Sequence, residues 1–215
     1  MPTIRKPRGR PRDDERAARR AEEILDVAAR VFAQRGYRNT DVQVVADQLG
    51  VGKGTIYRYF HTKRQLFLAA ADRGLQRLIA EMNTVPADID PLEQVAQAVR
   101  AYLNFYDAHP EYVELLMQER AEFKDRAKPT YFEYRGKSVR WGNVMRELVA
   151  QGRVRAAPRA ELNEVVGNLL YGTMFTNYFA GRAKSVEEQA RDILDVVFLG
   201  ILTPAEQARR AALGV

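Results

Sequence analysis

The seven residues from Lys53 to Tyr59 concentrate chemical groups that bind phosphates and nucleic-acid bases. They read Lys-Gly-Thr-Ile-Tyr-Arg-Tyr. At helical spacing Ile56 turns inward with the following Phe60, while the outward side chains are Lys53, Thr55, Tyr57, Arg58 and Tyr59. Cations, hydroxyls and phenols are the usual ligands of phosphates and base edges. A helix that only packed against a core would not need two cations and two tyrosines in so short a run.

For several of these side chains the sequence allows two interpretations of their role. A bidentate guanidinium recognises guanine, so Arg58 is the best candidate for base readout, with a phosphate contact as an equal alternative. Tyr57 either contacts phosphate or lies partly in the core. Thr55 either contacts a base or only favours the turn, and His61 fits a solvated loop.

The elements that must position this helix are predicted around it. A helix over residues 16–36 has one apolar face and ends at Gly36; the face consists of Ile24, Ala28, Val31 and Phe32. A second, short helix begins with a capping box of Thr40 and Gln43; its buried face consists of Val42, Val45, Ala46 and Leu49. Gly50 permits a tight turn, and Val51 fills the angle before the third helix, about 53–60. Two short helices joined through a glycine turn predict a helix-turn-helix.

The first residues form a basic arm. Residues 1–12 contain five basic residues, no acidic residue and three prolines, which favour an extended chain. Arg8 and Arg10 lie in a Pro-Arg-Gly-Arg-Pro run that resembles the core of an AT-hook, which suits a narrow minor groove. The alternative is a disordered basic tail that attracts phosphates without specificity.

The charge distribution agrees with a polyanion-binding N-terminal part. The net charge is +6, and residues 1–63 hold 14 Lys/Arg and 8 Asp/Glu, so the remainder of the chain is balanced. A basic segment joined to a neutral body indicates a nucleic-acid-binding module attached to a second function. We therefore expect an arm over 1–15, a DNA-binding domain over 16–63 and a second helical domain over 64–215.

The second part is also predicted to be helical, so the fold class is all-α. Helical runs cover about 63–84, 92–108, 110–124, 129–151, 159–180 and 186–202, and Gly152, Gly181 and Pro204 act as stops. No alternating strand pattern is evident. The last two runs carry broad apolar stripes, which either close the core of one chain or pair with a second copy.

Many aromatic residues with polar neighbours lie in the central helices. Each single aromatic residue favours a core position, but the set suggests a cavity with an apolar wall and a few polar groups. The candidate lining residues are Tyr106, Met117, Arg120, Phe123, Trp141, Tyr171, Phe175 and Tyr178.

The stretch 24–72 resembles the DNA-binding domain of tetracycline-repressor (TetR-type) regulators. The matching residues are Ala28, Phe32, Gly36, Tyr37, Thr40, Val45, Ala46, Gly50, Val51, Lys53-Gly54-Thr55-Ile56-Tyr57, Tyr59-Phe60 and Lys63. The resemblance implies that the third helix lines the major groove through Lys53, Gly54, Thr55, Tyr57, Arg58 and Tyr59. It implies phosphate contacts for Thr40 and Lys63. One departure is Gly52, where the family often has a serine, so this position offers no hydroxyl to phosphate.

The resemblance also implies a role for the second domain. It implies an inducer pocket among the central helices and a four-helix dimer interface built from the last two, here assigned to Leu162, Val166, Leu169, Val196, Val197 and Ile201. A two-fold protein matches a palindromic operator in double-stranded DNA.

The sequence therefore predicts a sequence-specific transcription regulator, in its simplest form a dimeric repressor released by a small molecule. The alternatives are an activator of the same fold or a non-specific architectural protein. We expect no enzyme, no cofactor and no metal site, because there is no cysteine, there are only two histidines, and no P-loop or dinucleotide motif is present. Without a secretory signal or a membrane-spanning run, we expect a cytoplasmic protein.

Overall fold

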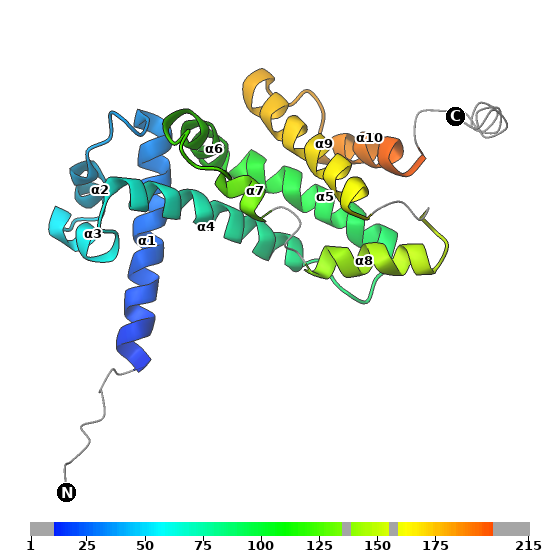
Figure 1. Ribbon diagram of the computed structural model, residues 1–215, viewed down its shortest axis with the longest axis horizontal. Helices are drawn as coiled ribbons and strands as arrows, with labels where there is room; N and C mark the ends of the chain where they lie inside the picture. Colours follow the sequence, from blue (N-terminus) through cyan, green and yellow to red (C-terminus); the bar gives the residue numbers. More distant parts are fainter. Residues whose placement is uncertain (1–10, 135–138, 155–158, 200–215) are drawn as a thin grey trace, which may run out of the picture. The chain divides into compact units, whose positions relative to one another are not determined.

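The computed structural model describes residues 11–134, 139–154 and 159–199, and all regular elements in these ranges are helices. This confirms the all-α class. The helices are α1 (Pro11–Arg35), α2 (Val42–Gln48), α3 (Lys53–Tyr59), α4 (Lys63–Asn83), α5 (Pro91–Ala108), α6 (Pro110–Glu122), α7 (Thr130–Tyr134), α8 (Val139–Ala150), α9 (Arg159–Ala180) and α10 (Val186–Leu199) (Figure 1).

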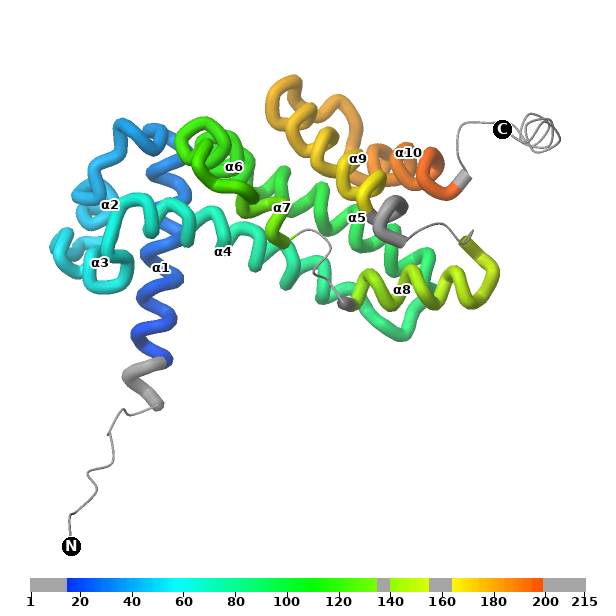
Figure 2. Tube along the Cα trace, viewed as in Figure 1, coloured from blue at the N-terminus to red at the C-terminus, as the bar shows by residue number. Residues whose placement is uncertain are grey.

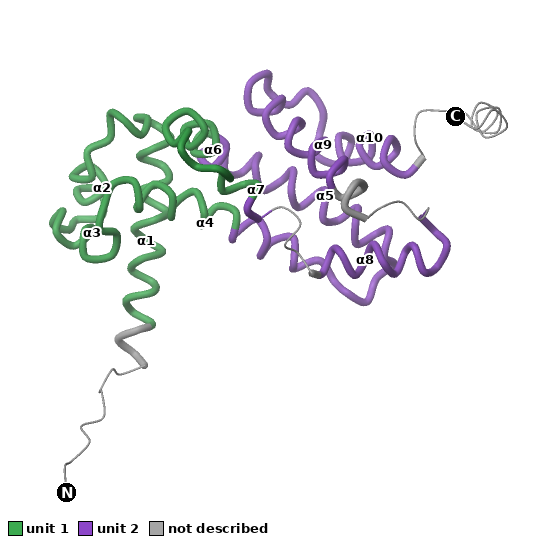
Figure 3. The backbone as a smooth tube through the Cα atoms, in the orientation of Figure 1, with its two compact units in different colours: residues 1–75, 114–132 green, residues 76–113, 133–215 purple. Residues whose placement is uncertain are grey.

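The chain divides into two compact units (Figure 3). Unit 1 contains residues 1–75 and 114–132, and unit 2 contains residues 76–113 and 133–215. Helices α4 and α6 therefore each continue from one unit into the other. The sequence predicted a domain boundary at residue 63, and it gave no indication that residues 114–132 group with the N-terminal helices.

Unit 1 is built on the predicted apolar face of α1. Ile24, Ala28, Val31 and Phe32 are at most 1% exposed, which confirms the helical spacing that predicted them. Helix α2 adds Val42, Val45 and Ala46 to this core, and α3 adds Ile56. The path of the chain through these three helices is clear in Figure 2.

An aromatic cluster completes the core of unit 1 and explains why residues 114–132 belong to it. The ring of Phe67 lies 5.1 Å from that of Phe32, 5.2 Å from that of Tyr37 and 5.4 Å from that of Phe123. Tyr37 and Phe123 also meet directly, at 4.8 Å between centroids. Gln118 adds a hydrogen bond of 2.9 Å from Nε2 to the carbonyl oxygen of Phe32.

Helix ends follow local residue chemistry with one difference from the prediction. Gly36 and Gly50 have φ angles of +78° and +63°, a conformation that favours glycine and stops α1 and α2. Helix α1, however, begins at Pro11 rather than near Arg16, so the prediction of extended chain through residue 12 is wrong for its last two residues. Proline fits the first helical turn, where its missing N–H costs nothing.

Unit 2 is organised around α5, which contacts α8, α9 and α10. Asp90 caps α5 by accepting from the backbone N–H of Leu92 at 2.9 Å, and Pro91 follows as the first helical residue. At α10, Ser185 and Glu188 form a capping box, with the Glu188 carboxylate accepting from the Ser185 N–H at 2.9 Å. The unit buries the side chains of Tyr102, Leu103, Phe105, Val144, Leu148, Leu170, Met174, Ala190 and Leu194.

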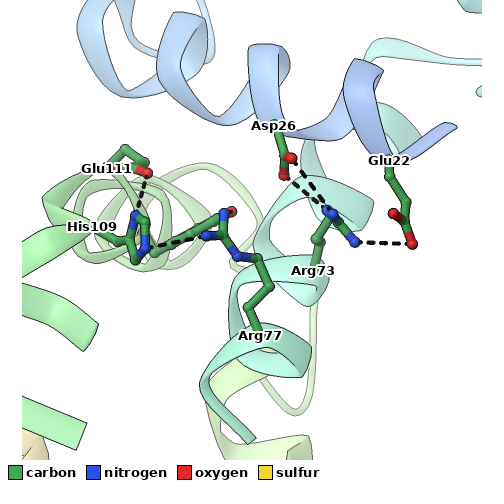
Figure 4. Close-up of polar contacts among 7 residues, drawn as sticks. Glu22, Asp26, Arg73, Arg77, His109 and Glu111 are labelled. Carbon is green, nitrogen blue, oxygen red and sulfur yellow. Dashed lines mark hydrogen bonds and ion pairs between the residues drawn. The ribbon is translucent and has the colours of Figure 1, made fainter. Parts of the chain in front are cut away.

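Helix α4 is tied to its neighbours in each unit by an arginine (Figure 4). In unit 1, Arg73 pairs with Asp26 of α1 at 2.8 Å and with Glu22 at 3.4 Å. In unit 2, a guanidinium nitrogen of Arg77 lies 3.2 Å from Nε2 of His109. Because guanidinium only donates, Nε2 must accept, which leaves Nδ1 to donate to Glu111 at 3.3 Å.

The predicted helical runs agree with most observed helices. The runs 92–108, 159–180 and 186–202 correspond to α5, α9 and α10, whose described part ends at Leu199, while α6 ends at Glu122 instead of residue 124. In the predicted run 129–151 the structure describes α7 and α8, and residues 135–138 lie outside the described ranges. Pro204, the last predicted stop, also lies outside them.

Candidate nucleic-acid interface

Helices α2 and α3 form the predicted bent pair. Between them the chain turns at Gly50, whose N–H donates to the carbonyl of Asp47 at 3.1 Å. The N–H of Val51 donates back to the carbonyl of Ala46 at 3.0 Å, and its side chain is half-buried. Helix α2 contacts both α1 and α3. Two short helices joined through a glycine turn and set against a longer one have the form of a helix-turn-helix.

The outer face of α3 carries the predicted cations and phenols. Ile56 is fully buried, whereas its neighbour Tyr57 is 37% exposed and Arg58 is exposed. The guanidinium of Arg58 lies 5.6 Å from the centre of the Tyr59 ring. Gly54 is exposed, and the side chains of Lys53, Thr55 and Tyr59 are half-buried. The face therefore offers one free guanidinium, one free phenol and an unobstructed backbone position to a ligand.

A carboxylate missed by the sequence analysis holds the first cation of α3. Oδ1 of Asp41 accepts from Nζ of Lys53 at 2.6 Å and from the backbone N–H of Gln43 at 2.8 Å. The Gln43 N–H, and then the Lys53 ammonium, hold the pKa of Asp41 below its ordinary value. The hydrogen bond to Asp41 raises the pKa of Lys53 in turn. The pair is therefore charged at neutral pH.

The predicted capping box of Thr40 and Gln43 is wrong. The N-cap of α2 is Asp41, and the helix begins at Val42. The hydroxyl of Thr40 instead donates to the carbonyl of Gly36 at 2.7 Å, and the residue is only 2% exposed. Thr40 therefore ties the end of α1 to the start of α2, and its hydroxyl does not present itself to phosphate as the resemblance implied.

Lys63 is also used inside the protein. Its ammonium donates to the carbonyl oxygens of Tyr37 at 2.8 Å, Thr40 at 3.0 Å and Arg38 at 3.2 Å. It also lies 4.6 Å from the centre of the Tyr37 ring. An ammonium has three donors, and all three are engaged by the segment between α1 and α2. This geometry opposes the phosphate contact that the resemblance implied for Lys63 and assigns it to holding that segment.

Two further arginines of unit 1 are paired with acidic residues at and after the end of α6. Nε of Arg38 donates to the carboxylate of Glu122 at 2.7 Å, although the Arg38 side chain remains 78% exposed. Arg64 pairs with Asp125 at 2.7 Å, and its guanidinium lies 5.0 Å from the Phe123 ring centre. These partners are far apart in sequence, so no local spacing pointed to them.

The candidate ligand-binding residues are divided between the two units. Met117, Arg120 and Phe123 belong to unit 1, where Phe123 is 6% exposed and forms part of the aromatic cluster. The other five belong to unit 2 and are Tyr106, Trp141, Tyr171, Phe175 and Tyr178. In unit 2, the Tyr106 ring packs against Tyr102 at 5.0 Å, and the Tyr102 hydroxyl lies 3.8 Å from the Met174 sulfur of α9. The Tyr171 and Phe175 rings meet at 4.8 Å.

Four of the candidate dimerisation residues can be placed, and they lie on α9 and α10 with side chains that are exposed or half-buried. Leu169 is 36% exposed and Val196 is 50% exposed, while Val166 and Val197 are half-buried. The side chain of Leu162 and the whole of Ile201 lie outside the described residues, as do Arg8 and Arg10 of the basic arm.

Metal-ligating side chains are dispersed in the part of the chain that the structure describes. There, no group of three or more histidine, aspartate or glutamate side chains is placed to hold a metal ion. Among the described helices, none combines the length and apolarity needed to cross a membrane.

A family model described as "Bacterial regulatory proteins, tetR family" matches residues 24–70, which contain α2, α3 and the adjoining parts of α1 and α4. Over a longer span, the HTH-type transcriptional repressor KstR2 of Mycolicibacterium smegmatis (strain ATCC 700084 / mc(2)155) is 26% identical over 190 residues. These residues cover 86% of this chain and 91% of that repressor.

Solved structures share the fold. The TetR family transcriptional regulator PfmR from Thermus thermophilus matches with a TM-score of 0.66 at 23% identity, over 84% of this chain and 99% of that one. The transcriptional regulator FadR from Bacillus subtilis, solved in complex with stearoyl-CoA, matches with a TM-score of 0.65 at 17% identity over the same shares. The bent helix pair thus coincides with the segment that matches the tetR family model, and the likeness to the solved structures is a likeness of fold.

Proposed function

We propose that this chain is a sequence-specific transcription regulator that reads double-stranded DNA through the outer face of α3. The observation that carries the proposal is the contrast between adjacent residues of that helix: Ile56 is fully buried, and Tyr57 and Arg58 are exposed. A short helix anchored from within and carrying cations and phenols outside suits the major groove.

We assign DNA-binding roles to individual residues from the exposure of their side chains and from the hydrogen-bond donors that they offer. Arg58 is the proposed base-reading residue, because its guanidinium has no carboxylate partner among the described residues and suits the two acceptors of guanine. Tyr57 is proposed to donate to phosphate. Gly54 permits close approach of the backbone, while Thr55 and Tyr59 border the contact. The arm residues Arg8 and Arg10 remain proposed minor-groove ligands.

We propose that α9 and α10 form the dimer interface. Most of the large hydrophobic side chains exposed in the described part lie on these two helices, and Phe179 is 70% exposed. Exposed apolar patches on a water-soluble surface mark interaction sites. A second copy of the same pair would cover them, and the two-fold dimer would match a palindromic operator.

We propose further that the protein is a repressor released by an apolar or amphipathic small molecule. The support is the set of aromatic rings on α5 and α9 in unit 2, together with the stearoyl-CoA bound to the Bacillus subtilis FadR of the same fold. Residues 64–215 would then sense the ligand and dimerise, residues 16–63 would bind DNA, and residues 1–15 would be the arm. A ligand releases DNA only if it prefers the conformation that binds DNA poorly. We propose the cytoplasm as the place of action, where DNA is accessible.

The decisive experiment is selection of bound duplexes from a random pool, followed by footprinting on the selected sequence. We expect a short palindromic protected site. Arg58→Ala should weaken binding to that site by about 1–3 kcal/mol and relax the preference at a few base pairs. Uniform coverage without a preferred sequence would support an architectural protein instead, and activation of a reporter by the bound protein would support an activator.

The ligand proposal is tested separately. Stearoyl-CoA and smaller aromatic compounds are added to the full chain, and both the melting temperature and the occupancy of the selected duplex are measured. A compound that raises the melting temperature and lowers occupancy supports release by ligand. Absence of any such compound in a broad panel would count against a sensor role.

A further inference from the structure

The N-terminal ends of α2 and α3 share one carboxylate. Asp41 caps α2 through the Gln43 N–H, at 2.8 Å from Oδ1, and the same oxygen accepts from Lys53 at 2.6 Å. Lys53 is the first residue of α3, and the N-cap of α3 is Gly52, which makes no side-chain hydrogen bond. The N-cap Gly52 provides no side-chain hydrogen bond to the start of α3, and Asp41 provides one through Lys53 instead.

The pair is open to solvent and therefore exchangeable. The side chains of Lys53 and Asp41 are 36% and 63% exposed. Ion pairs at such exposure are weak, so a phosphate can replace the carboxylate when it approaches at the right place. As long as Asp41 accepts from the Lys53 ammonium, a phosphate in another position adds little binding free energy by contacting that ammonium.

A second acidic residue of α2 makes a useful contrast. Oδ1 of Asp47 accepts from Nε2 of Gln43 at 2.6 Å, and no cation of the described residues pairs with its carboxylate. Asp41 and Asp47 thus place the same charge on or beside the same short helix, but only Asp41 contacts α3, through Lys53.

We propose that Asp41 is a specificity-determining residue, which withholds Lys53 from general phosphate binding and fixes the start of α3 against the start of α2. The inference rests on the proposed DNA-binding function. On random DNA the withholding of Lys53 dominates, because any free cation strengthens binding through counterion release. On the operator the fixed position of α3 matters as well, because base contacts require it.

The test compares Asp41→Asn with Asp47→Asn in the full chain. Asparagine caps helices about as well as aspartate, so Asp41→Asn retains the cap of α2 and loses the charge that holds Lys53. Affinity is measured on the selected operator and on a random duplex of equal length, over a series of salt concentrations. Melting temperatures verify that the variants fold, and Asp41→Ser, which also caps, replaces the asparagine variant if that one does not.

We expect Asp41→Asn to bind the random duplex roughly two- to fivefold more tightly, the size of an exposed ion pair. Its salt dependence should steepen by about one phosphate contact, a change of about 0.9 in slope. Operator affinity should change less, so discrimination falls. Asp47→Asn should leave the slope unchanged, and in a Lys53→Gln background Asp41→Asn should have no further effect on the slope.

Three results would overturn the inference: an unchanged slope in Asp41→Asn, equal changes in both aspartate variants, or equal tightening on operator and random DNA. Equal changes in the two variants would mean that any lost negative charge has this effect. Failure of the proposed function looks different, because the wild-type chain would then show no preference for any selected duplex, and the inference would fall with it.

Discussion

The helix pair α2–α3 in unit 1 and the helix pair α9–α10 in unit 2 both leave side chains exposed, but of opposite kinds. On α3 the exposed groups are a guanidinium and a phenol above a fully buried Ile56. On α9 and α10 they are apolar, including Phe179 at 70% and Val196 at 50% exposure. Each pair is anchored by its own unit, so neither exposed face is needed for the core.

The contrast indicates what each face binds. Cations and phenols are hydrated when free and exchange bound water for contacts with phosphates and base edges. The affinity of such binding depends strongly on salt. Apolar side chains gain only by leaving water, so they favour a protein surface of the same character. By our proposal, one chain thus carries a polar interface for DNA and an apolar interface for its own copy.

The largest effect is expected at the apolar face. Val196→Glu would place a charge without a partner in the proposed interface, which costs about 3–5 kcal/mol and raises the dimer dissociation constant more than a hundredfold. Sedimentation velocity measures the change. Val149→Glu is the matched control, because Val149 is a 37% exposed valine on α8, outside the proposed interface. If both variants remain dimeric, the interface lies elsewhere.

The next effect distinguishes the inner and outer sides of α3. Ile56→Ala should lower the free energy of unfolding by about 2–4 kcal/mol, since a fully buried side chain is truncated. Tyr57→Ala should change it by less than about 1 kcal/mol and weaken DNA binding instead. Urea unfolding and operator affinity together measure both. Equal destabilisation by the two changes would mean that Tyr57 belongs to the core.

A smaller effect is expected at Lys63. Lys63→Met removes the donor from three carbonyl groups and should lower the free energy of unfolding by about 1–3 kcal/mol. The salt slope of DNA binding should stay as in the wild type. A decrease of about 0.9 in that slope, with stability intact, would instead restore Lys63 as a phosphate ligand.

The smallest effect is a dependence of stability on acid pH. The pKa values of Asp90 and Asp125 are lowered by hydrogen bonds from Arg153 and Arg64, respectively. Because the folded pKa lies below the unfolded one, this stabilisation is present above about pH 4 and is lost as pH falls through the folded value. Melting temperatures between pH 7 and acid measure it, and Asp125→Asn should flatten the curve. A melting temperature that rose on acidification would contradict the sign.

The helices and the bent pair were predictable because their signals are local. The spacing of Ile24, Ala28, Val31 and Phe32 specifies one buried face. Gly36 and Gly50 end helices through positive φ angles that other residues rarely adopt. The cap of α2 was predicted wrongly, because Thr40 and Asp41 are adjacent and both residue types cap helices. Only the packing of Thr40 against the end of α1 decided between them.

By itself the sequence determined the helical class, the glycine-linked helix pair and the residue types on α3, because helical spacing and glycine turns are signals between near neighbours in the chain. It also determined the basic character of the N-terminal third, which is a matter of composition. Tertiary structure decided which cations are free. Lys53 is held by Asp41, Lys63 by three carbonyls and Arg38 by Glu122, which lies 84 residues away. Spacing cannot reveal such partners, because a long cationic side chain donates to whichever acceptor the folded chain brings within reach.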